Sequence, residues 1–225
     1  MLSYYGIGIA LTKLQLTLFA KWEVEGKEAI PPKGPLIVVA NHLSNADPPV
    51  VMASFNRRLN SLAKEAIFAN PLFSSIFYSV GAHPVKSSGR DMKALRWALK
   101  LLERDRAMLL FPEGERSKNA ALQRGKPGIG YLALRSQAPI LPVALTGTEN
   151  IPGMWRVAFP LCRIGVKIGE PFTLPVIEGK LSRPLLQQVT DIIMDRIAQL
   201  LPPQYRGYYA SKVPQGQRAP SISSE

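Results

Sequence analysis

Several short apolar runs occur along the chain, and each predicts a buried strand. The runs are residues 35–40, 107–111 and 140–145. Runs of this length, rich in branched side chains and bounded by turn formers, are typical of strands that are covered on both faces. Residues 161–168 instead alternate apolar and polar positions, which predicts a half-buried strand near a sheet edge. Trp22 and Val24 indicate one more short strand.

Amphipathic segments between these runs predict helices. Residues 92–104 place apolar side chains on one face and Lys and Arg on the other, and the capping-box spacing of Ser88 and Asp91 predicts Ser88 as the N-cap. Ser182 and Pro184 open a second helix that ends before two consecutive prolines. Alternating strands and helices predict a single α/β domain, with a mostly parallel or mixed central sheet flanked by helices.

Two apolar stretches bear on membrane association. The first, within residues 1–20, is interrupted by Lys13 and is too short for a span, which needs roughly 20 apolar residues. No basic run precedes it, so a secretory signal is not indicated. It predicts a short helix that either lies in the membrane interface or packs on the domain's own core. The second stretch, residues 66–85, predicts a buried or surface-docking helix that starts at Pro71.

These boundaries divide the chain into three parts. Residues 1–20 form the N-terminal apolar helix and residues 21–210 the α/β domain, while residues 211–225 are rich in Ser, Pro and Gln and predict a flexible tail. A total of 225 residues suits one such domain. The single cysteine, Cys162, excludes an internal disulfide framework and a four-cysteine metal site, and a reducing cytosolic compartment is the simplest expectation.

Net charge is the unusual feature of the composition. The chain has 28 basic and 16 acidic residues, a formal +12. That excess predicts an anionic partner, which could be nucleic acid, a membrane surface or a phosphorylated substrate. The chain has no basic run, no aromatic-studded sheet motif and no paired Cys and His ligands, so no nucleic-acid partner is expected.

Candidate chemistry begins directly after the first buried run. His42 lies just beyond the predicted strand, where α/β sheets place ligands, and Asp47 follows five positions later. In a strand-to-helix turn the carboxylate can fold back onto the imidazole, fix its tautomer and leave the other ring nitrogen free to take a proton. An unperturbed imidazole, with a pKa of roughly 6.5, suits a general base. The chain has no Gly-x-Ser-x-Gly motif, and Cys162 lies in a predicted strand, so the proton donor is expected to be a substrate hydroxyl.

A second cluster follows the next buried run. Glu113, Gly114, Arg116, Ser117 and Lys118 lie within six residues. The glycine lets backbone approach a ligand, and the guanidinium suits two-point contact with phosphate. A solvated charged turn is the alternative, and it is the less attractive one because both clusters leave strands in the same way.

At these positions the chain resembles the 1-acylglycerol-3-phosphate acyltransferase family, within the glycerophospholipid acyltransferases. His42 and Asp47 match its first motif, residues 111–117 (FPEGERS) its third and residues 138–143 its fourth, a proline-rich apolar segment. Lys64 resembles the basic residue that follows the first motif. The resemblance covers roughly residues 20–175.

The resemblance implies direct transfer of a fatty acyl group from a thioester, acyl-CoA or acyl carrier protein, to a lysophospholipid hydroxyl, most simply that of 1-acylglycerol 3-phosphate. It implies His42 as the base and Asp47 as its orienting acid, with no metal, no cofactor and no covalent enzyme intermediate. Glu113, Gly114 and Arg116 would line the acceptor site, with Lys64 adding charge. A backbone N–H near Gly114, or one opening the helix after His42, would stabilise the oxyanion. The expected location is the cytoplasmic side of an anionic membrane, peripheral or monotopic.

The second motif departs from the family pattern. Where that pattern has Asp and Arg after Pro-Val, this chain has Lys86 and Ser87, with Arg90 beyond. Lys86 or Arg90 would then take over the phosphate contact, as a point charge in the case of lysine. The departure leaves open another lysophospholipid, a different lipid hydroxyl, or a non-enzymatic membrane-binding module on the same scaffold.

Overall fold

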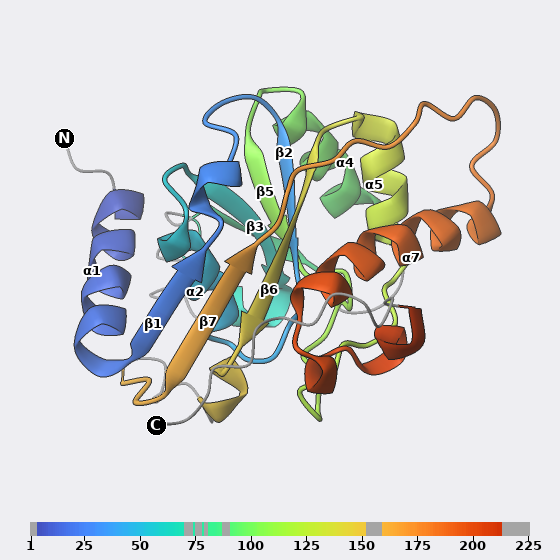
Figure 1. Ribbon diagram of the computed structural model, residues 1–225. Coiled ribbons are helices and arrows are strands. Elements are labelled where there is room, and N and C mark those ends of the chain that lie inside the picture. Colours follow the sequence, from blue (N-terminus) through green and yellow to red (C-terminus); the bar gives the residue numbers. More distant parts are fainter. Residues whose placement is uncertain are drawn as a thin grey trace.

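The computed structural model describes residues 4–69, 74, 78, 81–86, 91–151 and 159–212. Within these residues, one mixed sheet carries seven strands in the order β1-β7-β6-β2-β5-β3-β4 (Figure 1). The strands are β1 (Lys21–Glu25), β2 (Leu36–Ala40), β3 (Leu59–Lys64), β4 (Ala82–Val85), β5 (Ala107–Leu110), β6 (Ile140–Thr146) and β7 (Arg163–Ile168). Strands β6, β2, β5, β3 and β4 run parallel, whereas β7 is antiparallel to β6 and pairs in parallel with β1.

Helices cover both faces of the sheet. The α-helices are α1 (Tyr4–Phe19), α2 (Asp47–Ser54), α4 (Met92–Leu102), α5 (Gly128–Ser136) and α7 (Arg183–Leu200). Short 3₁₀ turns are η1 (Lys27–Ala29), η2 (Glu65–Phe68), η3 (Thr148–Asn150), η4 (Pro203–Tyr205) and η5 (Gly207–Lys212). Helices α1 and α2 lie on one face and α4, α5 and α7 on the other (Figure 1).

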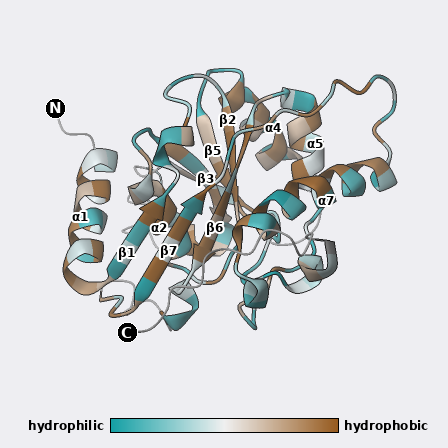
Figure 2. Ribbon diagram, viewed as in Figure 1, coloured by the Kyte–Doolittle hydropathy of each residue, from teal (hydrophilic) through white to brown (hydrophobic). Residues whose placement is uncertain are grey.

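Strand β2 separates two hydrophobic cores. Its side chains alternate, with Val38 in the core beneath α2, and Ile37 and Val39 in the core beneath α5 and α7. All five residues of β2 are fully buried, which explains why the run is apolar at every position rather than at every second one. Figure 2 shows hydrophobic residues concentrated in such central strands.

The predicted α/β architecture is confirmed, with two local corrections. Asp91, not Ser88, is the N-cap of α4, because its carboxylate accepts hydrogen bonds from the backbone N–H groups of Lys93 and Ala94. Strand β7 begins at Arg163, so Cys162 lies just before the strand and not within it. The helix predicted from Pro71 falls mostly outside the described residues. Of the predicted tail, residues 211–225, the first two residues belong to η5 and the rest lie outside the described residues.

Helix α1 carries apolar side chains on both its buried and its exposed face. Leu16 is buried against the core beneath α2, whereas five large apolar side chains on another face stay exposed: Tyr4, Ile7, Leu11, Leu14 and Leu18. Within the described part of the chain, no helix combines the length and hydrophobicity needed to cross a membrane.

Candidate active site

Four parallel strands bring the predicted site residues to one edge of the sheet. His42 follows β2, Glu113 and Arg116 follow β5, Lys64 ends β3 and Lys86 follows β4. Because Val39 pairs with Leu110 and Ser61 with Leu109, these strands end at nearly the same level. Neighbouring strands lie about 4.8 Å apart, which places the end of β3 roughly 10 Å across the sheet from that of β2. Arg90 lies outside the described residues.

The His42–Asp47 pair is formed. Nδ1 of His42 lies 2.7 Å from Oδ2 of Asp47, whose side chain is fully buried. Asp47 is the first residue of α2, so the turn after β2 folds the carboxylate back onto the imidazole. A carboxylate only accepts hydrogen bonds, which assigns the proton to Nδ1 and leaves Nε2 free to accept one from a substrate.

Backbone contacts immobilise both members of the pair. Oδ2 of Asp47 also accepts hydrogen bonds from the N–H groups of Leu43 and Ser44, at 2.6 and 2.8 Å. The His42 ring stacks on Phe111 at 4.2 Å, and the His42 carbonyl accepts a hydrogen bond from the N–H of Ser117 at 2.7 Å. The imidazole is 18% exposed, so it is fixed in position yet reachable from solvent.

Glu113 lies beneath the His42 loop. Its side chain is buried, with Oε1 accepting from the N–H of His42 at 2.7 Å and Oε2 accepting from the N–H of Gln123 at 2.8 Å. Burial raises the pKa of Glu113 to about 7, with a smaller contribution from the Asp47 charge, and the two N–H donors oppose the rise. The structure therefore shows Glu113 holding the backbone of His42; its direct contact with an acceptor stays a prediction.

Three backbone amides near the His42 loop already donate hydrogen bonds within the protein. The N–H of Gly114 donates to the Phe111 carbonyl at 2.9 Å, and those of Leu43 and Ser44 bind Asp47. These three amides are therefore not free for a tetrahedral oxygen, and an oxyanion contact from another N–H near Gly114, or from one opening α2, stays a prediction. Gly114 serves the turn itself: its φ of +72° favours glycine, and a Cβ there would lie 2.8 Å from the Lys126 side chain.

Exposed cations surround this edge of the sheet. Lys64, Lys86, Arg116 and Lys118 all present exposed side chains. Lys86 also helps line an open hollow of about 730 Å³ at the ends of β3 and β4, a volume within the range of small-molecule sites. The other lining residues are Glu65, Ala66, Phe68, Ala69, Tyr78 and Pro84.

The part of the chain that contains this site is similar to known proteins. A family model described as Acyltransferase matches residues 21–146, more than half of the chain. The chain belongs to the acyltransferase family. That match takes in the His42–Asp47 pair and the turn from Glu113 to Arg116.

Individual proteins with acyl-transfer names are similar in sequence to this chain. A chloroplastic 1-acyl-sn-glycerol-3-phosphate acyltransferase of Brassica napus is 28% identical over 136 residues, covering 59% of this chain and 39% of the relative. An N-acylphosphatidylethanolamine synthase of Arabidopsis thaliana is 29% identical over 199 residues, covering 76% of this chain and 70% of the relative. The chain thus spans well under half of the first relative's length.

One solved acyltransferase has a similar fold. The crystal structure of the 1-acyl-sn-glycerophosphate (LPA) acyltransferase PlsC from Thermotoga maritima superposes with a TM-score of 0.69 at 27% identity. The similarity covers 87% of this chain and 79% of that one. It therefore extends beyond residues 21–146 into the C-terminal helices.

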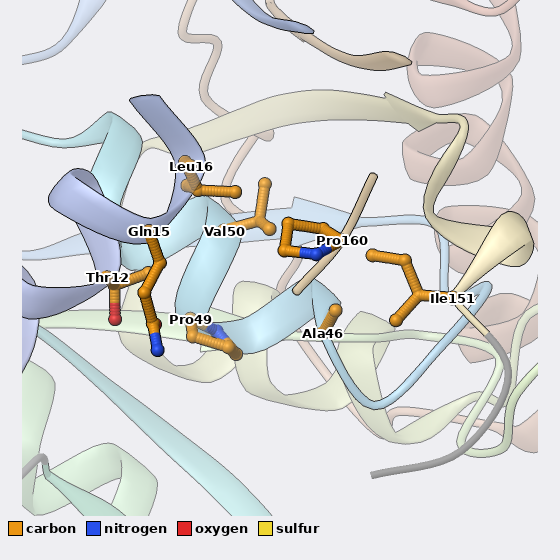
Figure 3. A pocket seen from close by; sticks show the side chains of 8 residues that line it. All are labelled: Thr12, Gln15, Leu16, Ala46, Pro49, Val50, Ile151 and Pro160. Atoms are coloured by element: carbon orange, nitrogen blue, oxygen red, sulfur yellow. The ribbon is translucent and has the colours of Figure 1, made fainter. Parts of the chain in front are cut away.

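A small cavity lies between α1 and the start of α2. It has a volume of about 50 Å³ and is lined by residues of α1, residues at the start of α2, and Ile151 and Pro160, which lie between η3 and β7 (Figure 3). Ala46 and Pro49, on either side of Asp47 along the chain, both face it (Figure 3). Ligand sites are usually several hundred Å³, so this space is a packing gap between α1 and α2 and not a substrate site.

Two positioning contacts were not predicted from the sequence. The Asn41 amide exchanges two hydrogen bonds with the backbone of Leu145, at 2.7 and 2.9 Å, and the Thr148 hydroxyl donates to Asp47 at 2.6 Å. Each partner lies more than 100 residues away along the chain, so no local spacing signals it. Among the described residues, no group of three or more His, Cys, Asp or Glu side chains is placed to hold a metal ion.

The raised pKa of Glu113 predicts a pH-dependent stability. Because the folded-state pKa is about 7 against an ordinary 4.5, the folded protein binds more protons than the unfolded chain between these values, and stability falls as pH rises through that window. At 1.36 kcal/mol per pH unit, the loss in the free energy of unfolding is about 3 kcal/mol by pH 7. Glu113→Gln removes this dependence, as urea unfolding at pH 5, 6, 7 and 8 would show.

Glu115→Gln is the matched control for this measurement, because the Glu115 side chain is 64% exposed beside the same turn. It should keep the wild-type pH dependence. A constant difference in unfolding free energy between wild type and Glu113→Gln across the pH range would contradict the account.

Proposed function

We propose that the protein transfers a fatty acyl group from an acyl thioester to the hydroxyl of 1-acylglycerol 3-phosphate, giving phosphatidic acid. The observation that carries the proposal is the buried Asp47 carboxylate 2.7 Å from Nδ1 of His42, with the opposite ring nitrogen free. The names of the Brassica napus and Thermotoga maritima relatives support the choice of acceptor.

His42 supplies the proton transfers of this reaction. Nε2 takes the proton of the acceptor hydroxyl as its oxygen attacks the thioester carbonyl, and Asp47 stabilises the imidazolium that forms. The carbon–sulfur bond then breaks, and the imidazolium returns the proton to the departing thiolate. The acyl group passes directly to the acceptor, so no enzyme nucleophile is required; Cys162 contacts the Gly147 carbonyl instead.

Basic side chains at the carboxyl ends of the strands suit the anionic substrates of this reaction. Residues 86–135 contain twelve Lys or Arg and five Asp or Glu, a large share of the formal +12. Arg116, Lys64 and Lys86 lie at or beyond the carboxyl ends of β5, β3 and β4, on the same edge of the sheet as His42, and supply charge for the acceptor phosphate, with Arg90 in the same stretch of sequence. The remaining cations suit an anionic lipid surface and the phosphates of acyl-CoA or of acyl carrier protein.

Arg116→Ala should raise the KM for the phosphorylated acceptor with little change in kcat. Removing a charged phosphate contact forfeits about 1.5–3 kcal/mol, which corresponds to about a 10- to 100-fold higher KM. Steady-state kinetics with varied acceptor would measure it. Arg104→Ala is the control, because Arg104 is exposed just before β5, at the opposite edge of the sheet. An unchanged KM in Arg116→Ala would argue against a phosphate contact.

A second acceptor class follows from the altered second motif. Lys86 and Ser87 replace the usual Asp and Arg, and one relative is named as an N-acylphosphatidylethanolamine synthase. Purified protein would be given one acyl-CoA and a panel of lysolipids, phosphatidylethanolamine and glycerol 3-phosphate, with products read by mass spectrometry. Acylation of 1-acylglycerol 3-phosphate in preference to the others supports the first proposal. Preference for another acceptor supports the second, and no product from any acceptor favours a non-enzymatic membrane-binding module.

The exposed face of α1 supports a peripheral or monotopic position on the cytoplasmic side of an anionic membrane. Its five apolar side chains recur every three or four residues, so they form one stripe along the helix. Phe159 packs edge-on against Phe19 at 5.0 Å and, with Leu161, extends the exposed apolar surface past the end of α1. Lys13 and Lys21 add charge suited to acidic lipids.

Leu11→Glu/Leu14→Glu should abolish flotation with phosphatidylglycerol-containing liposomes, because it places two charges within the stripe. Ile192→Glu is the control, since Ile192 is 49% exposed on α7, on the opposite face of the sheet. Equal flotation of the wild type and the double variant would contradict membrane docking through α1.

A further inference from the structure

We propose that Thr148 is a positioning residue for the His42–Asp47 pair, acting on the second oxygen of the carboxylate. The Thr148 hydroxyl donates to Oδ1 of Asp47 at 2.6 Å. Both side chains are fully buried, so bulk water does not compete for this contact. Thr148 lies two residues beyond the region that the family model matches.

The donors around Asp47 are unevenly divided between its oxygens. Oδ2 accepts three hydrogen bonds, from the ring of His42 and the N–H groups of Leu43 and Ser44. For Oδ1, the donor that the described residues show is Thr148. Donors on both oxygens fix the rotation of the carboxylate plane, and the one on Oδ1 draws charge away from the oxygen that faces His42. Thr148 therefore sets both the direction and the strength of the His42–Asp47 hydrogen bond.

The backbone after β6 is shaped to place this hydroxyl. Gly147 has a φ of +85°, and a Cβ there would lie 1.9 Å from the Arg163 carbonyl oxygen, so glycine is required. The resulting turn starts η3 at Thr148, whose carbonyl accepts from the N–H of Ile151. Together with the Asn41–Leu145 hydrogen bonds, this segment holds the His42 loop at both of its ends.

Thr148→Val and Thr148→Ser separate the hydroxyl from the shape of the side chain. The inference rests on the proposed acyl transfer, for which Thr148→Val should lower kcat about 10- to 100-fold with KM within about twofold, because the carboxylate plane is no longer fixed and Nε2 of His42 leaves its reactive orientation. Thr148→Ser keeps the donor and should stay close to wild type. Thr146→Val, the same substitution two residues earlier, is the matched control. Equal losses in the Val and Ser variants would overturn the proposal.

A spectroscopic readout distinguishes positioning from a merely structural role. The Nδ1 proton of His42 should give a downfield resonance, identified by its absence in His42→Ala, since the chain has only two histidines. In Thr148→Val that resonance should move further downfield, because the charge of Asp47 concentrates on the oxygen that it faces. Thr148→Cys, a weak donor of similar size, should lie between Val and wild type, and replaces Val if that variant does not fold.

Unchanged resonances throughout this series would overturn the proposal, even if kcat fell. The resonance is recorded without substrate. An absence of acyl transfer by the wild type would therefore refute the proposed function while leaving the role of Thr148 open to this separate test.

Discussion

Replacing His42 by alanine is expected to lower kcat for acyl transfer by about 10²- to 10⁴-fold, the usual contribution of a general base. The imidazole is the group held beside a buried carboxylate with a nitrogen free for substrate, so its removal leaves the acceptor hydroxyl without a partner for its proton. Release of free CoA from acyl-CoA in the presence of 1-acylglycerol 3-phosphate would measure the loss.

His83→Ala is the matched control for this experiment. His83 lies in strand β4, and its ring stacks on the ring of Trp97 with the centroids 4.2 Å apart. Burial lowers the pKa of the His83 imidazole, and the charge of Asp91 opposes this shift. His83 takes no part in the His42–Asp47 pair, so its variant should keep turnover near the wild-type value. Near-wild-type turnover in His42→Ala, with a cooperative unfolding transition in both variants, would contradict the assignment of the base.

Replacing Asp47 by asparagine is expected to be nearly as damaging. An asparagine can keep its oxygen toward His42, Leu43 and Ser44 and turn its amide toward the Thr148 hydroxyl, so the geometry of the loop survives. What disappears is the negative charge that stabilises the imidazolium in the transition state. We therefore expect kcat to fall by about 10²- to 10⁴-fold while the melting temperature changes little.

The double variant tests whether His42 and Asp47 work as one unit. Once the imidazole is absent, the carboxylate has no proton carrier to stabilise, so His42→Ala/Asp47→Asn should be about as slow as His42→Ala alone. Initial rates of the four proteins complete the cycle. Strictly multiplicative losses would show that Asp47 acts independently of His42.

The central strands could be predicted because strands buried on both faces have apolar residues at successive positions. Strand β2 is covered on both faces, so all five positions are apolar and the run is evident. Strand β3 was not predicted, because Asn60 and Ser61 interrupt its apolar positions. Its extended form depends on parallel pairing with β5 on one side and β4 on the other, which no local pattern contains.

The same distinction applies to the site. His42 and Asp47 belong to one strand-to-helix turn, so their contact could be predicted from spacing and context. The sequence predicts Glu113 as part of a ligand-binding cluster, and its burial under the His42 backbone depends on the fold of the segment up to Gln123, which local spacing does not show. Thr148 is 101 residues from Asp47 and meets it because β6 lies beside β2 in the sheet.

In the proposed reaction, the His42–Asp47 pair activates a lipid hydroxyl for direct attack on an acyl thioester. Its most direct test is the initial rate of phosphatidic acid formation from 1-acylglycerol 3-phosphate and acyl-CoA, measured by mass spectrometry with wild type and His42→Ala side by side. We expect rapid product formation by the wild type and a rate lower by at least about a hundredfold in the variant. Equal rates, or no acylated product from folded wild-type protein, would contradict it.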